Sequence, residues 1–174
     1  MNQLSDSIRS IPDFPKKGIV FRDITTLLKN PEAFKNAVDL FSEKYHNSKI
    51  DKVVCIESRG FIIGSALAVN LGAGFVPVRK KGKLPAEVIT EQYALEYGTD
   101  SVEMHVDAIR PGERVLLHDD LLATGGTMCA AIKLVEKLQA KIVGVSFLIE
   151  LSFLQGRKRM QGQDVYSLIL YDKE

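Results

Sequence analysis

The sequence predicts an α/β fold in which a mostly parallel, twisted sheet is flanked by helices. Along its 174 residues, apolar segments too short for helices alternate with longer segments of helical periodicity. Such alternation is typical of parallel sheets whose connecting helices cover both faces. No internal repeat, low-complexity tract or linker interrupts the pattern, so we expect a single domain over residues 1–174.

The N-terminal part contains one clear helix. We expect a helical turn over residues 4–11 that ends before Pro12, a proline-containing loop over 13–18 and a short extended segment over 19–23. Residues 30–32 then combine an asparagine N-cap, a proline in the first helical position and an acid in the first turn. The helix that they begin has one apolar face, made by Phe34, Val38, Phe41 and Tyr45.

Other buried strands and one more helix are expected further along the chain. A helix of small residues over 60–70 is ended by Gly72, since glycine suits the residue after a helix. The strands are expected over residues 52–57, 74–78, 142–151 and 164–170.

Residues 79–108 differ from their surroundings in charge and pattern. Two extended segments, over roughly 88–96 and 101–108, make this stretch a hairpin-like flap outside the core. The exposed charge of the loop around residues 79–97 and its lack of an apolar face predict that this loop is mobile when empty and ordered over bound ligand. The cations that begin it, in an expected exposed loop over 79–85, are Arg79, Lys80, Lys81 and Lys83.

The most informative stretch is residues 115–127. An apolar segment too short for a helix reads as a buried strand and ends in two carboxylates, Asp119 and Asp120. A short loop with paired glycines and two threonines follows, and then an amphipathic helix. In an open α/β sheet, ligands bind at the carboxyl ends of the strands, where these acids are expected.

The loop after the acids has the composition of a phosphate site. Gly125 and Gly126 allow backbone conformations that other residues resist, and they let a ligand approach the main chain. Free N–H groups at the start of the next helix favour an anion, and the hydroxyls of Thr124 and Thr127 add donors. Adjacent acids instead suit sugar hydroxyls or a hydrated Mg²⁺. The stretch therefore predicts a site for a phosphorylated sugar; the alternative is a tight turn with a helix-capping acid.

Composition and charge argue against several classes of protein. The net charge of +1 disfavours a protein that mainly binds nucleic acid or an acidic membrane. Cys55 and Cys129 are far apart and form no CxxC motif, which indicates reduced thiols in a cytoplasmic protein. The chain has no apolar run long enough for a membrane span and no signal-peptide core. Its three histidines lack metal-ligand spacing, so a zinc site is not expected.

Other functions also use a strand that ends in acids. An ATPase needs a GxxxxGK[ST] loop, which the sequence lacks. A DNA-binding regulator that senses the same sugar phosphate needs a helix-turn-helix or a basic face, and the residues before the first strong helix leave no room for it. The Gly72-Ala73-Gly74 segment lacks the third glycine of a dinucleotide fingerprint and precedes a strand. An enzyme acting on a sugar phosphate is the preferred interpretation.

Four segments resemble the type I phosphoribosyltransferases, and among them the enzymes that act on adenine. They are Glu57-Ser58-Arg59-Gly60-Phe61, residues 79–85, Leu95-Glu96-Tyr97-Gly98 and residues 115–127. The resemblance covers the chain from Ile11 to about Leu151. It implies transfer of the 5-phosphoribosyl group from 5-phosphoribosyl 1-pyrophosphate to adenine, giving AMP and pyrophosphate. One departure is His118, where the family usually has a small apolar residue.

The resemblance also implies roles for individual residues. Residues implied to bind the 5′-phosphate and ribose are Asp119, Asp120, Ala123, Thr124, Gly125, Gly126 and Thr127. Those implied to bind pyrophosphate are Ser58, Arg59, Arg79, Lys80 and Lys83. Adenine is expected to stack on Phe21 and to contact Val20, Arg22 and Leu151. The implied catalytic residues are Glu96 as acid–base partner of the purine, Tyr97 as a cover for the site, Arg59, Asp119 and Asp120.

Further expectations concern larger features. The resemblance implies an N-terminal hood of about residues 1–30 and a flexible flap of about residues 79–108. It implies Mg²⁺ as cofactor, entering with the sugar pyrophosphate; Asp119 and Asp120 are the candidates for direct contact with the metal. It also implies a homodimer in which a basic flap residue reaches the neighbouring site, without nucleic-acid or membrane partners.

Overall fold

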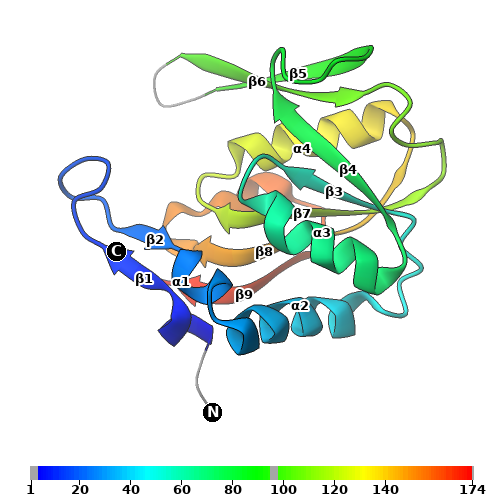
Figure 1. The fold of residues 1–174 in the computed structure, drawn as a ribbon. Coiled ribbons are helices and arrows are strands. Elements are labelled where there is room, and N and C mark those ends of the chain that lie inside the picture. The colour runs from blue at the N-terminus through cyan, green and yellow to red at the C-terminus, as the bar shows by residue number, and fades with distance from the viewer. Residues whose placement is uncertain (1–3, 95–97, 174) are drawn as a thin grey trace.

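A seven-stranded sheet runs through the protein in the order β5-β6-β4-β3-β7-β8-β9 (Figure 1). The computed structural model describes residues 4–94 and 98–173. β3, β4, β7, β8 and β9 are parallel, and β5 and β6 add an antiparallel edge, which confirms the predicted mostly parallel sheet. The strands are β3 (Lys52–Ile56), β4 (Gly74–Lys80), β5 (Val88–Ala94), β6 (Thr99–His105), β7 (Arg114–Leu122), β8 (Lys141–Leu151) and β9 (Val165–Tyr171).

Helices cover both faces of this sheet, as predicted. α2 (Pro31–Tyr45) and α3 (Gly60–Leu71) lie on one face, and α4 (Gly126–Lys137) lies on the other (Figure 1). Each face has its own apolar cluster, in which Phe41 of α2 and Leu134 of α4 are completely buried. Strands between two helical layers must be apolar on both sides, which explains the apolar runs of β3 and β7. Among the described residues, no helix combines the length and apolar character needed to cross a membrane.

Two predicted helix ends have the expected local chemistry. The side chain of Asn30 accepts hydrogen bonds from the backbone N–H groups of Glu32 and Ala33, at 3.1 and 3.2 Å. Gly72 ends α3 in the left-handed conformation, with φ of 64°. The predicted N-cap of α2 and the predicted end of α3 are therefore confirmed.

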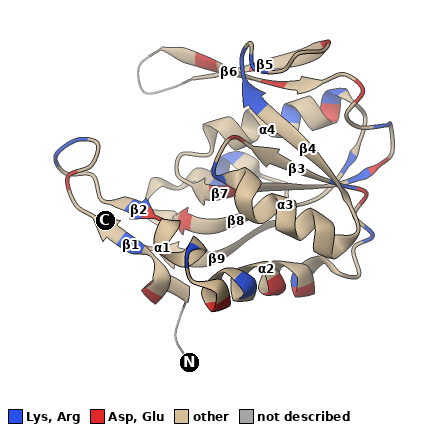
Figure 2. Cartoon of the chain, viewed as in Figure 1, with Lys and Arg blue, Asp and Glu red and all other residues tan. Residues whose placement is uncertain are grey.

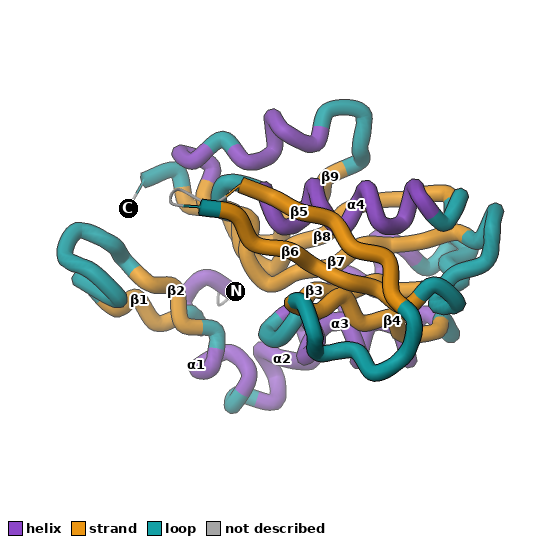
Figure 3. The backbone as a smooth tube through the Cα atoms, turned by 90° about the horizontal axis from the view of Figure 1, so that it is seen from above, coloured by secondary structure: helices purple, strands orange, loops and turns teal. Residues whose placement is uncertain are grey.

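The N-terminal segment forms a two-stranded sheet that stands apart from the main sheet (Figures 1 and 3). The predicted helical turn over residues 4–11 is wrong in its second half, because Arg9 lies in a strand and pairs with Asp23 of the partner strand. The side-chain hydrogen bond from Arg9 is the largest of the interactions that hold the pKa of Asp23 at about 2. The elements here are the 3-10 helix η1 (Leu4–Ser7), β1 (Arg9–Ile11), β2 (Phe21–Asp23) and the short helix α1 (Thr25–Leu28).

The segment predicted as a flap belongs to the main sheet. Arg79 and Lys80 continue β4 and pair with β6, so the expected loop over 79–85 begins only at residue 81. The β5–β6 hairpin lies alongside α4 (Figure 3). The expected lack of an apolar face is wrong, because side chains on one side of the hairpin pack into the α4 cluster. These side chains are Ile89, Tyr93, Val102 and Met104.

The connection between β8 and β9 contains two short 3-10 helices. They are η2 (Ser152–Leu154) and η3 (Gly156–Met160). These two helices are not predicted from the sequence, because helices of this length are too short to show helical periodicity. η3 packs against α4, and its first residue touches the loop before that helix.

Candidate active site

A cavity of about 440 Å³ lies at the carboxyl ends of β3, β4 and β7. The two predicted strand-end motifs, residues 57–60 and 119–127, meet there because β3 and β7 are parallel neighbours. A smaller cavity of about 90 Å³ lies along residues 121–128. The larger cavity is lined by Ile56, Glu57, Ser58, Arg59, Lys80, Tyr93, Val102, Asp119, Asp120, Leu121 and Thr127.

The acid pair lies within β7 and not after it, because the strand continues to Leu122. Asp119 packs against the first residue of α3: a Cβ atom added to Gly60 would lie 2.7 Å from its Oδ1. Burial and the neighbouring carboxylate of Asp120 raise the pKa of Asp119 well above its usual value. Burial also raises the pKa of Asp120, although the nearby Arg59 offsets part of this effect. Gly60 is therefore a site residue, through its fit to Asp119, that the sequence analysis did not assign.

Arg59 links the acid pair to the N-terminal two-stranded sheet. Its Nε lies 2.9 Å from Oδ2 of Asp120, a side chain that is only 7% exposed. Its guanidinium carbon lies 5.1 Å from the ring centroid of Phe21, within the range of a cation–π contact. The structure thus brings a residue predicted to bind pyrophosphate next to the residue predicted to stack on the base.

Residues 123–127 form the predicted phosphate loop and the start of α4. Gly125 is the N-cap, with φ of 79°, a conformation that glycine adopts without the cost of a Cβ atom. The first backbone N–H groups of α4 have no partner within the helix, so they are available to an anion. A Cβ atom on Gly126 would lie 3.5–3.6 Å from atoms of Arg159, Ala94 and Tyr93, which places β5 and η3 close to this loop.

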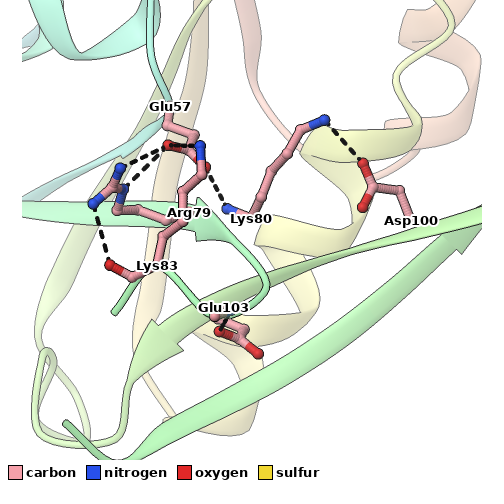
Figure 4. A network of polar contacts seen from close by, with 7 residues as sticks. Glu57, Arg79, Lys80, Lys83, Asp100 and Glu103 are labelled. Atoms are coloured by element: carbon pink, nitrogen blue, oxygen red, sulfur yellow. Dashed lines mark hydrogen bonds and ion pairs between the residues drawn. The ribbon is translucent and has the colours of Figure 1, made fainter. Parts of the chain in front are cut away.

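The cations at the end of β4, blue in Figure 2, are held by the acid Glu57 (Figure 4). Arg79 donates from Nε and Nη2 to Oε2 of Glu57, each at 3.1 Å, and Nζ of Lys83 lies 3.3 Å from the same oxygen. The backbone N–H of Lys80 donates to Oε1 at 2.6 Å. Burial alone would raise the pKa of Glu57, but these hydrogen bonds together lower it. Glu57 therefore stays ionised and orients the cations beside the cavity.

Asp100 and Tyr93 extend this network, and neither was assigned from the sequence. Nζ of Lys80 lies 3.2 Å from Oδ2 of Asp100 (Figure 4). The Tyr93 hydroxyl donates to the same oxygen at 3.1 Å. The Tyr93 side chain also forms a hydrogen bond with Thr127 of the phosphate loop. The alternation of side chains along β5 indicates that Tyr93 faces inward, but only the pairing of the β5–β6 hairpin with β4 places this residue at the cavity.

The remaining residues predicted to contact the base come from distant parts of the chain. Val20 and Arg22 flank the predicted stacking residue, and Leu151 is the half-buried last residue of β8. The guanidinium carbon of Arg22 lies 3.9 Å from the ring centroid of Tyr171. The predicted catalytic residues Glu96 and Tyr97 lie outside the described residues.

His118, the departure within the signature, is a core residue. Its side chain is completely buried, and its ring lies edge-on to Phe41 with 5.1 Å between centroids. The Ser146 hydroxyl donates to the carbonyl of Leu117 at 3.2 Å, so it accepts from Nδ1–H of His118 at 2.9 Å. Burial lowers the pKa of His118 to about 3, so the ring is neutral at pH 7.

Comparison with known proteins agrees with this geometry. The family model for the phosphoribosyl transferase domain matches residues 23–168. The adenine phosphoribosyltransferase of Brachyspira hyodysenteriae is 62% identical over 169 residues, which cover 97% of this chain and 99% of that protein. The crystal structure of the Thermoanaerobacter pseudethanolicus adenine phosphoribosyltransferase is 52% identical, with a TM-score of 0.94 over 97% of this chain and 98% of that one.

A more distant relative has been solved with ligands. The Trypanosoma brucei adenine phosphoribosyl transferase, in complex with AMP, pyrophosphate and ribose-5-phosphate, is 28% identical and has a TM-score of 0.88. The match covers 96% of this chain and 78% of that one. With sequence, fold and site in agreement, this chain belongs to the adenine phosphoribosyltransferases of the phosphoribosyl transferase family.

Proposed function

We propose that this chain transfers the 5-phosphoribosyl group of 5-phosphoribosyl 1-pyrophosphate to adenine, forming AMP and pyrophosphate. The observation that carries the proposal is the convergence of an acid pair, an anion-binding loop and the cations Arg59 and Lys80 on two cavities that share Asp119, Leu121 and Thr127. The substrate has a matching order of groups, with a 5′-phosphate, a hydroxylated ring and a pyrophosphate. The family membership of the chain and the ligands of the T. brucei relative support the same reaction.

Each part of the substrate has a proposed set of contacts. The 5′-phosphate binds to Ala123, Thr124, Gly125, Gly126 and Thr127, and the ribose hydroxyls face Asp119 and Asp120. Pyrophosphate binds to Ser58, Arg59, Arg79, Lys80 and Lys83. The base stacks on Phe21 between Val20, Arg22 and Leu151. Support for this division comes from the lining of the two cavities: the phosphate loop lines the smaller one, whereas Ser58, Arg59 and Lys80 line the larger one.

Catalysis in this proposal depends mainly on positioning and electrostatics. Breaking the bond between C1 and the pyrophosphate oxygen places positive charge on the ribose and negative charge on the leaving group. The carboxylates of Asp119 and Asp120 face the ribose, and the cations now bound to Glu57 and Asp100 turn to the leaving group. These acids hold the cations beside the cavity, from where the cations can turn to pyrophosphate.

The purine requires a further group. Glu96 is proposed as its acid–base partner and Tyr97 as the cover for the site, on the basis of the Leu95-Glu96-Tyr97-Gly98 resemblance. Arg59, which lies between Asp120 and Phe21, is proposed to move toward the pyrophosphate when substrate binds.

Mg²⁺ is proposed to enter with the sugar pyrophosphate. Among residues 4–94 and 98–173, no group of three or more His, Cys, Asp or Glu side chains is arranged to hold a metal ion. Asp119 and Asp120 are hard oxygen donors, which suit Mg²⁺. Because burial disfavours their charged forms, they fit a metal ion that is held mainly by substrate oxygens. When bound, the ion neutralises charge on the pyrophosphate.

A homodimer is also proposed, with α3 and β4 at its centre. α3 has no acidic or basic residue, and Val69 and Ile62 on its outer side are 79% and 40% exposed. Phe75 of β4, which is 37% exposed, lies edge-on to Phe61 of α3 and extends this apolar surface. A second copy is the proposed occupant because α3 begins directly after Arg59, which lines the cavity, so a partner packed on α3 would lie close to the site.

The chain is proposed to act in the cytoplasm as a single domain. Cys55 and Cys129 are both free, which supports a reducing compartment. The described part of the chain contributes all its long strands to one sheet, which supports a single domain.

The proposed function is tested by replacing the acid pair. Asp119→Asn and Asp120→Asn variants are incubated with adenine, the sugar pyrophosphate and Mg²⁺, and AMP formation is compared with that of the wild type. We expect both variants to fold, as judged by circular dichroism, and to transfer at least about tenfold more slowly, since groups that stabilise transition-state charge typically contribute this much or more. Full activity in both variants contradicts the site assignment.

A further inference from the structure

The 3-10 helix η3 forms a second wall of the phosphate loop. A Cβ atom on Gly156 would lie 2.2 Å from the carbonyl oxygen of Ala123, so only glycine fits at this point. In return, a Cβ atom on Gly125 would lie 2.9 Å from the carbonyl oxygen of Gly156. The two backbones therefore touch directly, and the position of η3 is fixed relative to the loop.

An ion pair between an exposed arginine and a buried carboxylate anchors η3 to the sheet. Nε of Arg157 donates to Oε1 of Glu150 at 3.0 Å, and Glu150 is 4% exposed. The Ser167 hydroxyl donates to the other carboxylate oxygen at 2.7 Å. The side-chain hydrogen bond from Arg157 is the main cause of the lowered pKa of Glu150. Met160, at the other end of η3, is buried in the α4 cluster.

The basic residues of η3 are not equivalent. Arg157 is committed to Glu150, and Nζ of Lys158 bonds to the Gln155 side chain at 2.9 Å, away from the loop. Arg159 instead extends over the loop. Its Nη1 lies 3.5 Å from the carbonyl oxygen of Thr124 and 3.5 Å from the position of a Cβ atom added to Gly126. Among the described residues, no acid lies within ion-pair distance of Arg159.

This position is electrostatically unfavourable for a cation unless an anion is present. Gly126 is the first residue of α4, and the N-terminus of a helix carries partial positive charge. The contact with the Thr124 carbonyl is at the outer limit of hydrogen-bond length, so it offsets little of the repulsion between the guanidinium and the helix N-terminus. A phosphate group in the loop would be attracted both by the helix N-terminus and by the guanidinium.

We propose that Arg159 binds the 5′-phosphate of the substrate and of AMP, as a charged donor added to the backbone N–H groups of residues 123–127. The inference rests on the proposed function, which places that phosphate in the loop. Arg159 contributes to binding the phosphoribosyl group and not to bond breaking, because it lies over the loop and is not among the residues that line the cavity with the acid pair. η3 holds Arg159 in place through the contacts of Gly156 and the Glu150–Arg157 pair.

The test compares ligands that differ only in the phosphate. Calorimetric titration measures the affinities of AMP and adenosine for the wild type and for the full-length variants Arg159→Ala, Arg159→Lys and Lys158→Ala. Arg159 is exposed, so its replacement leaves the core intact. We expect Arg159→Ala to weaken AMP binding about tenfold, the value of one charge-assisted hydrogen bond, and to leave adenosine binding unchanged. Arg159→Lys should retain part of the affinity, and Lys158→Ala all of it.

The outcomes separate this inference from the function on which it rests. Unchanged AMP affinity in Arg159→Ala, or an equal loss for AMP and adenosine, overturns the role of Arg159. If the wild type binds AMP no more tightly than adenosine, the proposed phosphate site itself is wrong. In kinetics, Arg159→Ala should raise the KM for the sugar pyrophosphate about tenfold with kcat within about twofold of the wild type. A fall in kcat alone also overturns the inference.

Discussion

At the scale of residues, this site is built from charges that hold one another before any substrate is present. Glu57 binds Arg79 and Lys83, and Asp120 lies against Arg59. A buried carboxylate without a partner is costly, so each acid in the cavity is matched by a cation or a hydrogen bond. The same pairs provide the orientation that catalysis by electrostatics requires.

The acid pair leads to a prediction about pH and stability. Burial raises the pKa of Asp119 above its usual value of 3.8. Between pH 3.8 and the raised pKa, the carboxyl is therefore protonated in the folded state but ionised in the unfolded state. Stability therefore falls as pH rises through the raised pKa, and Asp119→Asn should be more stable than the wild type at pH 7. We expect a gain of a few degrees in Tm, since about 1 kcal/mol corresponds to roughly 2–4 °C at this size.

Thermal unfolding at pH 7 and pH 4 checks this prediction. The gain should be smaller at pH 4, where the wild-type carboxyl is itself closer to neutral. Asp39→Asn is the control, because Asp39 is on the surface of α2, paired with Lys35, and should show no such gain. A loss of stability at pH 7 in Asp119→Asn would mean that the carboxylate is needed for the fold.

The second prediction is that Gly125 and Gly126 of the loop differ in how well they tolerate a side chain. A side chain on Gly125 would be strained by its φ of 79° and would meet the Gly156 carbonyl oxygen at 2.9 Å. A Cβ atom on Gly126 meets only ordinary contacts, at 3.5 Å and beyond. We expect Gly125→Ala to weaken AMP binding at least about tenfold, because a non-glycine residue in a strained conformation costs about 1–3 kcal/mol. Gly126→Ala should change it less than about threefold. Titration with AMP measures both, and the reverse order contradicts the loop geometry.

At the scale of elements, the strands and helices with regular periodicity could be predicted from the sequence. α2, α4 and the strands around residues 115–127 follow from the spacing of apolar residues and from the N-cap at Asn30. β1 and η3 could not be predicted, because they are short and depend on contacts with distant residues, such as Asp23 and Gly125. For the same reason the site residues Asp100 and Tyr93 were missed: their roles depend on the pairing of β6 with β4.

The β5–β6 hairpin leads to a prediction about exchange. Because Ile89, Tyr93 and Met104 pack on α4, we expect the amide protons of β5 and β6 to be protected with or without substrate. Residues 81–87, which lie outside the strands, should gain protection only when the sugar pyrophosphate and Mg²⁺ are added. Hydrogen exchange followed by mass spectrometry measures both segments. Rapid exchange throughout the hairpin in the empty protein would instead support a flap that moves as a whole.

The outer surface of α3 leads to a prediction about assembly. Val69→Glu places a charge on the exposed apolar surface around Ile62 and Phe75, so we expect it to convert a dimer into monomers of 19.3 kDa. Leu170→Glu is the matched control, because Leu170 is 55% exposed but lies on the edge strand β9, which β3, β7 and β8 separate from β4. Light scattering after size-exclusion chromatography measures the mass. A dimer that persists in Val69→Glu, or that Leu170→Glu dissociates, contradicts the α3 interface.

At the scale of the whole molecule, the site joins three parts of the chain that are far apart in sequence. The N-terminal sheet provides Phe21, the ends of β3 and β7 provide Arg59 and the acid pair, and α4 provides the phosphate loop. A parallel sheet makes this possible, because it brings the carboxyl ends of its strands to one edge. The order of these parts from the N-terminal sheet to α4 is the order of base, sugar and phosphate in AMP.

The base that accepts the phosphoribosyl group is adenine. Adenine presents an amino donor and a bare N1 acceptor, whereas guanine and hypoxanthine present a carbonyl and an N1–H on the same edge. If backbone groups of Val20 and Arg22 read this edge, as the resemblance implies, an inverted edge leaves both unpaired. Each unpaired buried group costs on the order of 1–3 kcal/mol, so together they disfavour the 6-oxopurines by at least about 30-fold.

The most direct measurement is the rate of nucleotide formation with each purine. The purified chain is incubated with the sugar pyrophosphate, Mg²⁺ and adenine, guanine or hypoxanthine, and kcat/KM is determined for each base. We predict AMP formation with adenine and values at least about 30-fold lower for the other two purines. Comparable rates with guanine would contradict the assignment of adenine while leaving phosphoribosyl transfer intact, and no nucleotide with any purine would contradict the reaction itself.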